Sequence, residues 1–302
     1  MRIATVCLAL LATGWLMLST QEKPPLIRDY VSANVGPVPA DLGLDPFYKK
    51  YTDAMGIPIV SSEKPPDAAL LVARDIVIHM LAKRPDIRDA LVGRKWRIGV
   101  MAHTEMTTDI PEHRNLKKPA PPANMSEEAR ARYEKQTDKQ YWDGRARGLG
   151  GNPTTCAEEN LLGYPGTRYF GEHILVHEFG HAILNGGIRT VDPKMFEEVR
   201  QAYTEAMAKG LWKGHYAASN FNEYWAEGTQ NWFWSNYGFH DGDRYIISPD
   251  DLKAYDPKLY ELLGRVYQDH HIPMDVYYAK DIRPAGRVPG NPAPAKNTER
   301  KQ

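Results

Sequence analysis

Apolar residues recur at helical spacing along several stretches of the chain, and these stretches predict the main elements of the fold. Between Asp67 and Leu81 the sequence DAALLVARDIVIHML indicates a helix, with Asp67 as its N-cap. The short apolar run from Trp96 to Ala102 indicates a buried strand. We also expect an edge strand at residues 154–162 and helices at 167–184, 193–209, 222–237 and 257–268, the first of these ending at Asn185-Gly186-Gly187.

The composition at the two ends of the chain differs from that of its middle. One arginine precedes an apolar run from Ala4 to Leu18, which is typical of a secretory signal peptide. The run is short for a membrane span, which needs roughly 20 apolar residues; a retained N-terminal anchor is the alternative. The expected organisation is a signal peptide at 1–20, an extended lead-in at 21–39, one folded domain at 40–282 with a polar surface excursion at 117–140, and a disordered tail at 283–302.

Charge and cysteine content exclude several classes of protein. The 302 residues include 38 basic and 38 acidic side chains, and this balance argues against a nucleic-acid-binding protein. Of the two cysteines, Cys7 lies in the expected signal peptide, so Cys156 is left as a single buried or free thiol. Without a C-x-x-C pair, a zinc site built from thiolates is excluded. No other stretch could cross a membrane, so we expect an exported protein with no stable membrane insertion after signal cleavage.

The segment His177-Glu178-Phe179-Gly180-His181 has the pattern H-E-x-x-H. Two histidines four positions apart share one face of a helix, so both imidazoles can reach one metal ion. Glu178 lies a step round the helix, where its carboxylate can touch a water molecule on that ion. The flanking residues are apolar, and a buried helix should not carry such polar side chains without partners. The segment predicts a zinc site; the alternative is a pair of ordinary helix histidines.

A catalytic zinc holds three protein ligands and keeps one position open, so a third ligand is needed. Glu223 and Glu227 lie about 40 residues downstream on an expected helix and share one of its faces. One of them can bind the metal while the other accepts the N–H of a ligating histidine. The alternative is a solvated acidic face, which the many aromatic residues of this helix disfavour.

Glycine occurs at two unusual positions near these residues. Gly180 and Gly228 stand inside the two expected helices, where glycine costs about 1 kcal/mol relative to alanine. We therefore expect close approach of the helices there. A third glycine-rich stretch, Gly148-Leu149-Gly150-Gly151, lacks the Gly-Lys-Ser/Thr ending of a phosphate-binding loop.

Together with Glu223-Tyr224-Trp225-Ala226-Glu227, the histidine segment resembles the gluzincin metallopeptidases, especially the catalytic domain of anthrax toxin lethal factor and its secreted relatives. The similarity covers residues 167–237. It implies a zincin-like α+β fold, rich in helix, with a small twisted sheet packed on the active-site helix. It also implies Zn²⁺ held by His177, His181 and Glu223, with Glu227 supporting a ligand.

The same resemblance implies the chemistry. The protein would be a secreted, periplasmic or cell-surface zinc endopeptidase that acts on a peptide or protein substrate. Glu178 would be the general base, and Tyr216, seven residues before Glu223, matches a catalytic tyrosine that stabilises the oxyanion. By analogy, an extended peptide would lie along the strand at 155–161. Upstream of the similar region the sequence departs from the family, so its substrate-binding residues are not carried over.

Two other functions compete with this interpretation. One is a catalytically inactive, zinc-stabilised binding module at the cell surface, which the presence of Glu178 disfavours. The other is a glycan-binding protein that uses the aromatic helix, which would require exposed rings at Trp225, Trp232 or Trp234.

Overall fold

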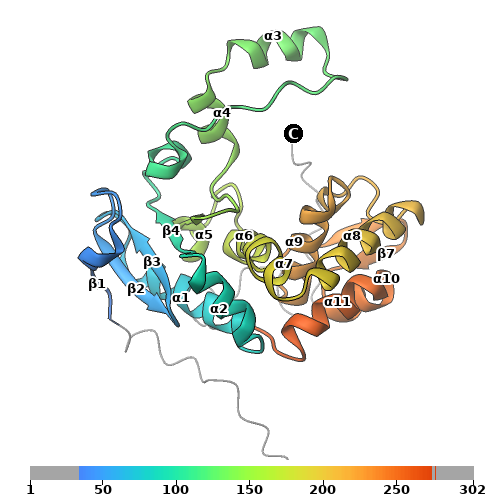
Figure 1. The fold of residues 1–302 in the computed structure, drawn as a ribbon. Coiled ribbons are helices and arrows are strands. Elements are labelled where there is room, and N and C mark those ends of the chain that lie inside the picture. Colours follow the sequence, from blue (N-terminus) through green and yellow to red (C-terminus); the bar gives the residue numbers. More distant parts are fainter. Residues whose placement is uncertain (1–33, 274–275, 277–302) are drawn as a thin grey trace, which may run out of the picture.

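A five-stranded sheet forms one side of the molecule and a group of helices forms the other (Figure 1). The structure is a computed structural model that describes residues 34–273 and 276. The strands of the sheet are β1 (Gly36–Pro37), β2 (Lys50–Ala54), β3 (Ile57–Ser61), β4 (Ile98–Met101) and β5 (Thr154–Ala157), and they lie in that order. The first three are antiparallel, whereas β3, β4 and β5 run parallel to one another. A separate hairpin consists of β6 (Phe239–Asp241) and β7 (Arg244–Ile246).

Eleven α-helices surround these sheets in the described part of the chain, and four of them begin with proline at the first helical position, where its missing N–H costs nothing. Before β5 come α1 (Asp67–Leu81), α2 (Pro85–Gly93), α3 (Glu127–Lys135) and α4 (Asp138–Arg145). After it come α5 (Glu158–Leu161), α6 (Ile174–Ala182), α7 (Arg189–Val191), α8 (Pro193–Ala208), α9 (Phe221–Trp232), α10 (Pro249–Tyr255) and α11 (Pro257–Tyr267). The expected α+β class is therefore correct.

Helix α6 lies between the two halves and joins them (Figure 1). It packs on β5 on one side and on α9 on the other. Leu175 and Phe179 of α6 and Trp225 of α9 are fully buried in a hydrophobic core that extends through both halves. The core thus fixes how α6 and α9 face each other.

The expected helices at 67–81, 193–209 and 257–268 and the strand at 96–102 are confirmed, with small shifts at their ends. Asp67 is not the N-cap expected for the first of them, because Pro66 takes that position and Asp67 is the first helical residue. The helix expected at 167–184 begins only at Ile174, and Asn185-Gly186-Gly187 does not end it, because a π-helical turn, Ile183–Ile188, carries it on into α7. A Cβ on Gly187 would lie 2.4 Å from Ile87 Cγ2. Gly186 and Gly187 therefore let this turn approach α2, and they do not act as a C-cap.

Two other elements are shorter in the structure than the sequence predicts. The edge strand expected at 154–162 ends at Ala157, and α5 takes up the rest. The helix expected at 222–237 ends at Trp232, shortly before Trp234 adopts a positive φ of 49°. Such a conformation cannot continue a right-handed helix.

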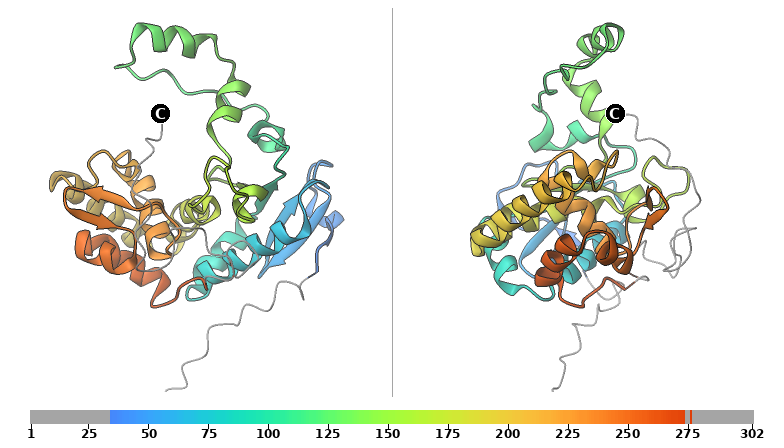
Figure 2. Two further views of the ribbon diagram at one scale, coloured as in Figure 1. Left: turned by 180° about the vertical axis from the view of Figure 1, so that it is seen from behind. Right: turned by 90° about the vertical axis from the view of Figure 1, so that its right-hand side faces the viewer.

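Residues 114–146 form an arm that carries α3 and α4 away from the rest of the molecule, as all three views show (Figures 1 and 2). This arm is the polar excursion expected at 117–140. Neither α3 nor α4 has a buried side chain. Within the described ranges, none of the helices is long and apolar enough to span a membrane.

The expected ends of the chain lie largely outside the described residues. This applies to the signal peptide at 1–20, to the tail at 283–302 and to most of the lead-in at 21–39. The last residues of the lead-in are described, and there Gly36 and Pro37 pair with Tyr51 and Lys50 of β2.

A buried pair of histidines links the first helix to the segment after the last one. His79 Nδ1 of α1 lies 2.8 Å from His270 Nε2, and both side chains are buried. Burial lowers the pKa of His79 to about 3, with a further contribution from His270. Burial also lowers the pKa of His270 to about 4, with help from Lys83 and His271. Both folded-state pKa values lie below the ordinary histidine value near 6.5.

This pair predicts loss of stability in mild acid. The stabilisation is complete above about pH 6.5 and is lost as the pH falls, because only the unfolded chain then binds the protons readily. Between pH 7 and pH 5.5 the wild-type protein should lose about 2 kcal/mol more than a His79→Gln/His270→Gln variant. Urea unfolding at the two pH values measures this difference. Equal losses would show that the pair titrates in the folded protein as it does in the unfolded chain.

Candidate metal centre

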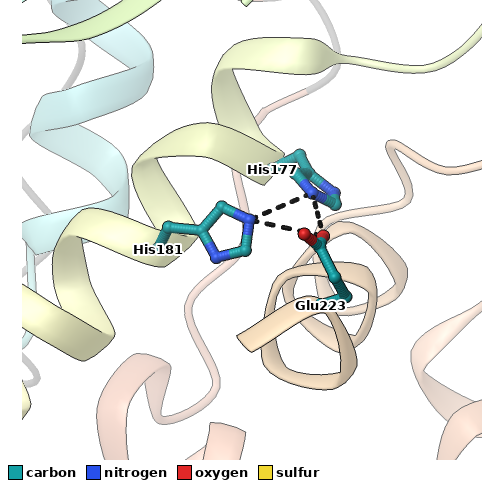
Figure 3. Close-up of side chains that lie close together, drawn as sticks. All are labelled: His177, His181 and Glu223. Atoms are coloured by element: carbon teal, nitrogen blue, oxygen red, sulfur yellow. Dashed lines mark hydrogen bonds and ion pairs between the residues drawn. The ribbon is translucent and has the colours of Figure 1, made fainter. Parts of the chain in front are cut away.

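Three side chains from two helices converge on one point (Figure 3). His177 and His181 of α6 bring their Nε2 atoms within 3.2 Å of each other. Glu223 Oε2 of α9 lies 2.9 Å from His177 Nε2 and 3.4 Å from His181 Nε2. These are the three residues that the sequence and its resemblance select as zinc ligands, and among the described residues they form the one group with metal-ligating geometry.

The distances suit a divalent metal ion. Zinc binds imidazole nitrogen at about 2.0–2.1 Å, so the ligand atoms of a tetrahedral site lie about 3.4 Å apart. The three separations in this cluster, 2.9, 3.2 and 3.4 Å, are close to that spacing. Two imidazoles and one carboxylate also form a donor set that zinc accepts, with room for a fourth ligand. The residues present therefore fit the implied metal.

Helix α6 is held in place at its start and near its end. Asn160, in the short helix after β5, accepts a hydrogen bond from the Ile174 N–H at 2.8 Å and so satisfies the first turn of α6. Gly180 lies against Thr229 of α9, where a Cβ would meet the threonine side chain at 3.4 Å. Trp225 Nε1 donates to the Gly180 carbonyl at 3.1 Å. The two helices are thus in contact at Gly180 as expected, although a Cβ would also fit there.

Gly228 also marks a close approach, but to a different helix. A Cβ there would lie 2.6 Å from Leu259 Cδ2, so this glycine brings α9 against α11 and not against α6.

The start of α9 favours a negative charge at Glu223. The Asn220 side chain caps the helix by accepting from the N–H groups of Asn222 and Glu223, at 2.9 and 3.2 Å. Glu223 therefore lies in the first turn, near the positive end of the helix dipole. The helix dipole therefore stabilises the carboxylate even without a nearby cation.

The hydrogen-bond partner of His177 is a residue that the sequence did not select. We expected Glu227 to accept the imidazole N–H, but Glu227 Oε1 lies 3.7 Å from His177 Nδ1. Gln230 Oε1, one turn further along α9, lies 2.9 Å from the same atom. Glu227 is fully buried and accepts from the Asn236 side-chain amide, and its Oε2 lies 3.8 Å from His215 Nε2.

The glycine-rich stretch at 148–151 lies against the candidate site. A Cβ on Gly148 would lie 2.4 Å from Ile174 Cγ2, and one on Gly150 would lie 3.1 Å from His181 and 3.3 Å from Glu178 Oε2. Leu149 exchanges backbone hydrogen bonds with Thr155 of β5, at 3.3 and 2.9 Å, as an antiparallel neighbour. β5 is thus the last strand of the sheet, and Leu149 covers its outer edge at Thr155, beside α6.

Tyr216 lies at the cluster, in a short 3₁₀ helix that precedes α9. Its hydroxyl donates to Glu223 Oε1 at 3.2 Å, and its ring stacks near that of His177. The neighbouring His215 is held by a hydrogen bond from the Ala217 N–H to its Nδ1, and its ring packs on Phe239. Of the two side chains, Tyr216 is therefore the one that contacts the candidate ligands.

The electrostatics of the cluster are set by burial and by its own charges. Burial acts to lower the pKa of His177, but the hydrogen bond to Glu223 and the nearby charges of Glu178 and Glu227 raise it to about 10. Burial acts to raise the pKa of Glu223, but the two imidazoles hold it well below its usual range. The pKa of Glu178 is raised, mainly by burial. Burial and the Glu223 charge raise the pKa of Tyr216, which keeps its hydroxyl protonated.

Two of the three candidate glycan-binding tryptophans are unavailable to a ligand. Trp225 and Trp232 are buried, and their indole N–H groups donate to Gly180 and His270 carbonyls. Trp234 is partly buried. The aromatic residues of α9 therefore serve the core.

No protein-family model matches the chain, and no curated protein sequence matches it.

The contact between the glycine-rich stretch and α6 predicts a large difference between two glycine substitutions. In Gly148→Ala the new methyl group would collide with Ile174 and with the Thr155 carbonyl, at 2.4 and 2.8 Å, so it should cost about 1–3 kcal/mol. Gly144→Ala is the control, because Gly144 lies in α4 with no atom within 4 Å of such a methyl group. The control should be neutral or more stable by about 0.5–1 kcal/mol. Denaturant unfolding compares them, and equal stabilities would contradict this packing.

Proposed function

We propose that the protein is a secreted zinc-dependent endopeptidase with a zincin-like catalytic domain of the gluzincin type. The observation that carries the proposal is the convergence of His177, His181 and Glu223, with their ligand atoms 2.9–3.4 Å apart. Glu178 follows His177 on α6, and Tyr216 contacts Glu223. One site thus combines a metal-ligating set, a carboxylate base and a phenol.

The arrangement of the sheet supports a zincin-like fold. The parallel strand β5 leads through α5 and a loop into α6, and α6 packs on that strand. The antiparallel neighbour of β5 is Leu149, whose stretch lies over Glu178 and His181. An extended peptide could add to this outer edge by backbone hydrogen bonds and so lie across the candidate metal ligands.

Each residue would have a defined part in peptide hydrolysis. His177, His181 and Glu223 would hold the zinc ion, which supplies Lewis-acid activation of water and of the peptide carbonyl. Glu178 would accept the proton of the attacking water and return it to the amine nitrogen that leaves. The Tyr216 hydroxyl would donate a hydrogen bond to the carbonyl oxygen as negative charge develops on it.

The main alternative is a zinc-stabilised binding module without catalytic activity. Its hallmark would be a missing base or a blocked fourth position. Glu178 is present and partly exposed beside the candidate ligands, which favours the enzyme. A glycan-binding role is disfavoured by the burial of Trp225 and Trp232.

The test joins metal analysis to a cleavage assay. Purified protein should contain about one zinc per chain and cleave members of a peptide library, and a chelator should abolish cleavage. Glu178→Gln should keep the zinc and lose nearly all cleavage, because the amide cannot take the proton. His177→Ala and Glu223→Ala should lose both. N-terminal sequencing of the exported protein should find a start near residues 19–23.

Two results would reject parts of this proposal. Full cleavage by Glu178→Gln would exclude the mechanism, and zinc without cleavage of any peptide would favour the binding module. Full zinc occupancy in Glu223→Ala would remove Glu223 from the ligand set. An exported protein that still begins at Met1 would support an anchor.

Tyr216→Phe tests the oxyanion role. The change removes only the hydroxyl, so zinc content and folding should be retained, while kcat should fall on the order of 10²–10³ with a smaller change in KM. His215→Ala serves as the comparison, because His215 is the adjacent donor but faces Glu227 and Phe239. Steady-state kinetics at matched zinc content measures both. A severe loss in His215→Ala with little change in Tyr216→Phe would transfer the role to His215.

A further inference from the structure

Gln230 has the geometry of a residue that orients a metal ligand. Its side chain is fully buried on α9 and makes three hydrogen bonds. Its Nε2 donates to the carbonyls of His173 and Ser235, at 3.2 and 3.3 Å. Carbonyl oxygens can only accept, so these two bonds fix which end of the amide is nitrogen. Gln230 Oε1 must therefore face His177.

This orientation determines the protonation of one imidazole nitrogen. An amide oxygen only accepts hydrogen bonds, so His177 Nδ1 must carry a proton to make the 2.9 Å contact. With Nδ1 protonated, Nε2 is the nitrogen that can offer a lone pair to a metal ion, and Nε2 is the atom that faces His181 and Glu223. When a metal ion displaces the Nε2 proton, Gln230 therefore keeps the remaining proton on Nδ1, which is the tautomer that the candidate metal centre needs.

We propose that Gln230 is the positioning residue for His177: it fixes the tautomer and ring orientation of this ligand and thereby sets the affinity for zinc. The proposal rests on the metal centre proposed above. Glu227 then belongs to a different set of contacts. Its carboxylate accepts a hydrogen bond from Asn236 and lies 3.8 Å from His215, the residue before Tyr216.

Gln230 also ties together the backbone on both sides of the site. His173 is the residue before α6, and Ser235 follows the end of α9. The Ser235 carbonyl accepts from the His173 N–H at 2.9 Å as well as from Gln230. One buried amide therefore links the start of the helix that carries two ligands to the end of the helix that carries the third.

Two nearly isosteric variants separate positioning from a purely structural role. Gln230→Leu removes the acceptor and the donors, whereas Gln230→Glu loses donors but keeps an oxygen facing His177 Nδ1. Both should be less stable than wild type. Zinc affinity, measured by competition with a chromophoric chelator, should fall 10–100-fold in Gln230→Leu and by much less in Gln230→Glu. Asn231→Ala, the adjacent buried amide on α9, should bind zinc as wild type does.

A second readout does not depend on zinc. In ¹⁵N-histidine-labelled, metal-free protein, the Nδ1 proton of His177 should be protected from exchange with solvent in wild type and Gln230→Glu. This protection should be lost in Gln230→Leu. Equal zinc affinity in wild type and Gln230→Leu, or an unprotected Nδ1 proton in wild type, would overturn the inference. A fall in affinity confined to Glu227→Gln would give the role to Glu227. A protected proton in a wild-type protein that binds no zinc would reject the proposed function but keep the hydrogen bond.

Discussion

Two imidazoles and a carboxylate meet between α6 and α9, and burying such groups costs several kcal/mol unless each polar atom finds a partner. Much of the structure around them can be understood as meeting that requirement. Asn160 and Asn220 satisfy the first turns of the two helices, and Trp225 donates to the Gly180 carbonyl where the helices meet. The ligand atoms then partner one another, and Gln230 takes the remaining nitrogen of His177. The contacts that fix the positions of α6 and α9 are therefore the same contacts that satisfy the buried polar atoms of the site.

The site also depends on both halves of the molecule. The sheet half supplies β5 and the stretch at 148–151, which press on the face of α6 beside Glu178 and His181. The helical half supplies Glu223 and Tyr216. On the proposed function, a peptide lying along the glycine-rich edge would thus contact one half while Tyr216 of the other half approaches its carbonyl. Because Glu178 lies on α6 and Tyr216 in the helical half, a relative shift of the halves would change the distance between these two side chains.

The sequence predicts the elements that depend on local pattern and misses those that depend on long-range packing. The i, i+4 spacing of His177 and His181 is enough to place them on one face, and α1, α8 and α11 follow from periodicity, with proline at the first position of the last two. Gly186 and Gly187 look like a helix stop, yet they serve contacts with Ile87 and its neighbours that only the tertiary structure reveals. Gln230 shares the face of Glu223 at i+7, a signal that was present in the sequence. To choose Gln230 over Glu227 as the partner of His177, one must know how far α9 is shifted along α6. The spacing of residues within one helix does not give that shift.

The arm at 114–146 has a consequence for how such a protein can diversify. Since α3 has no buried side chain, the core should keep its contacts when the sequence or length of the α3 part of this segment changes. The arm nevertheless returns to the molecule through Arg145 and Gly144, whose carbonyls accept hydrogen bonds from Tyr169 and Arg168, shortly before the stretch that borders α6. The α3 part of the arm can therefore vary in sequence and length without changing the packing around the candidate site.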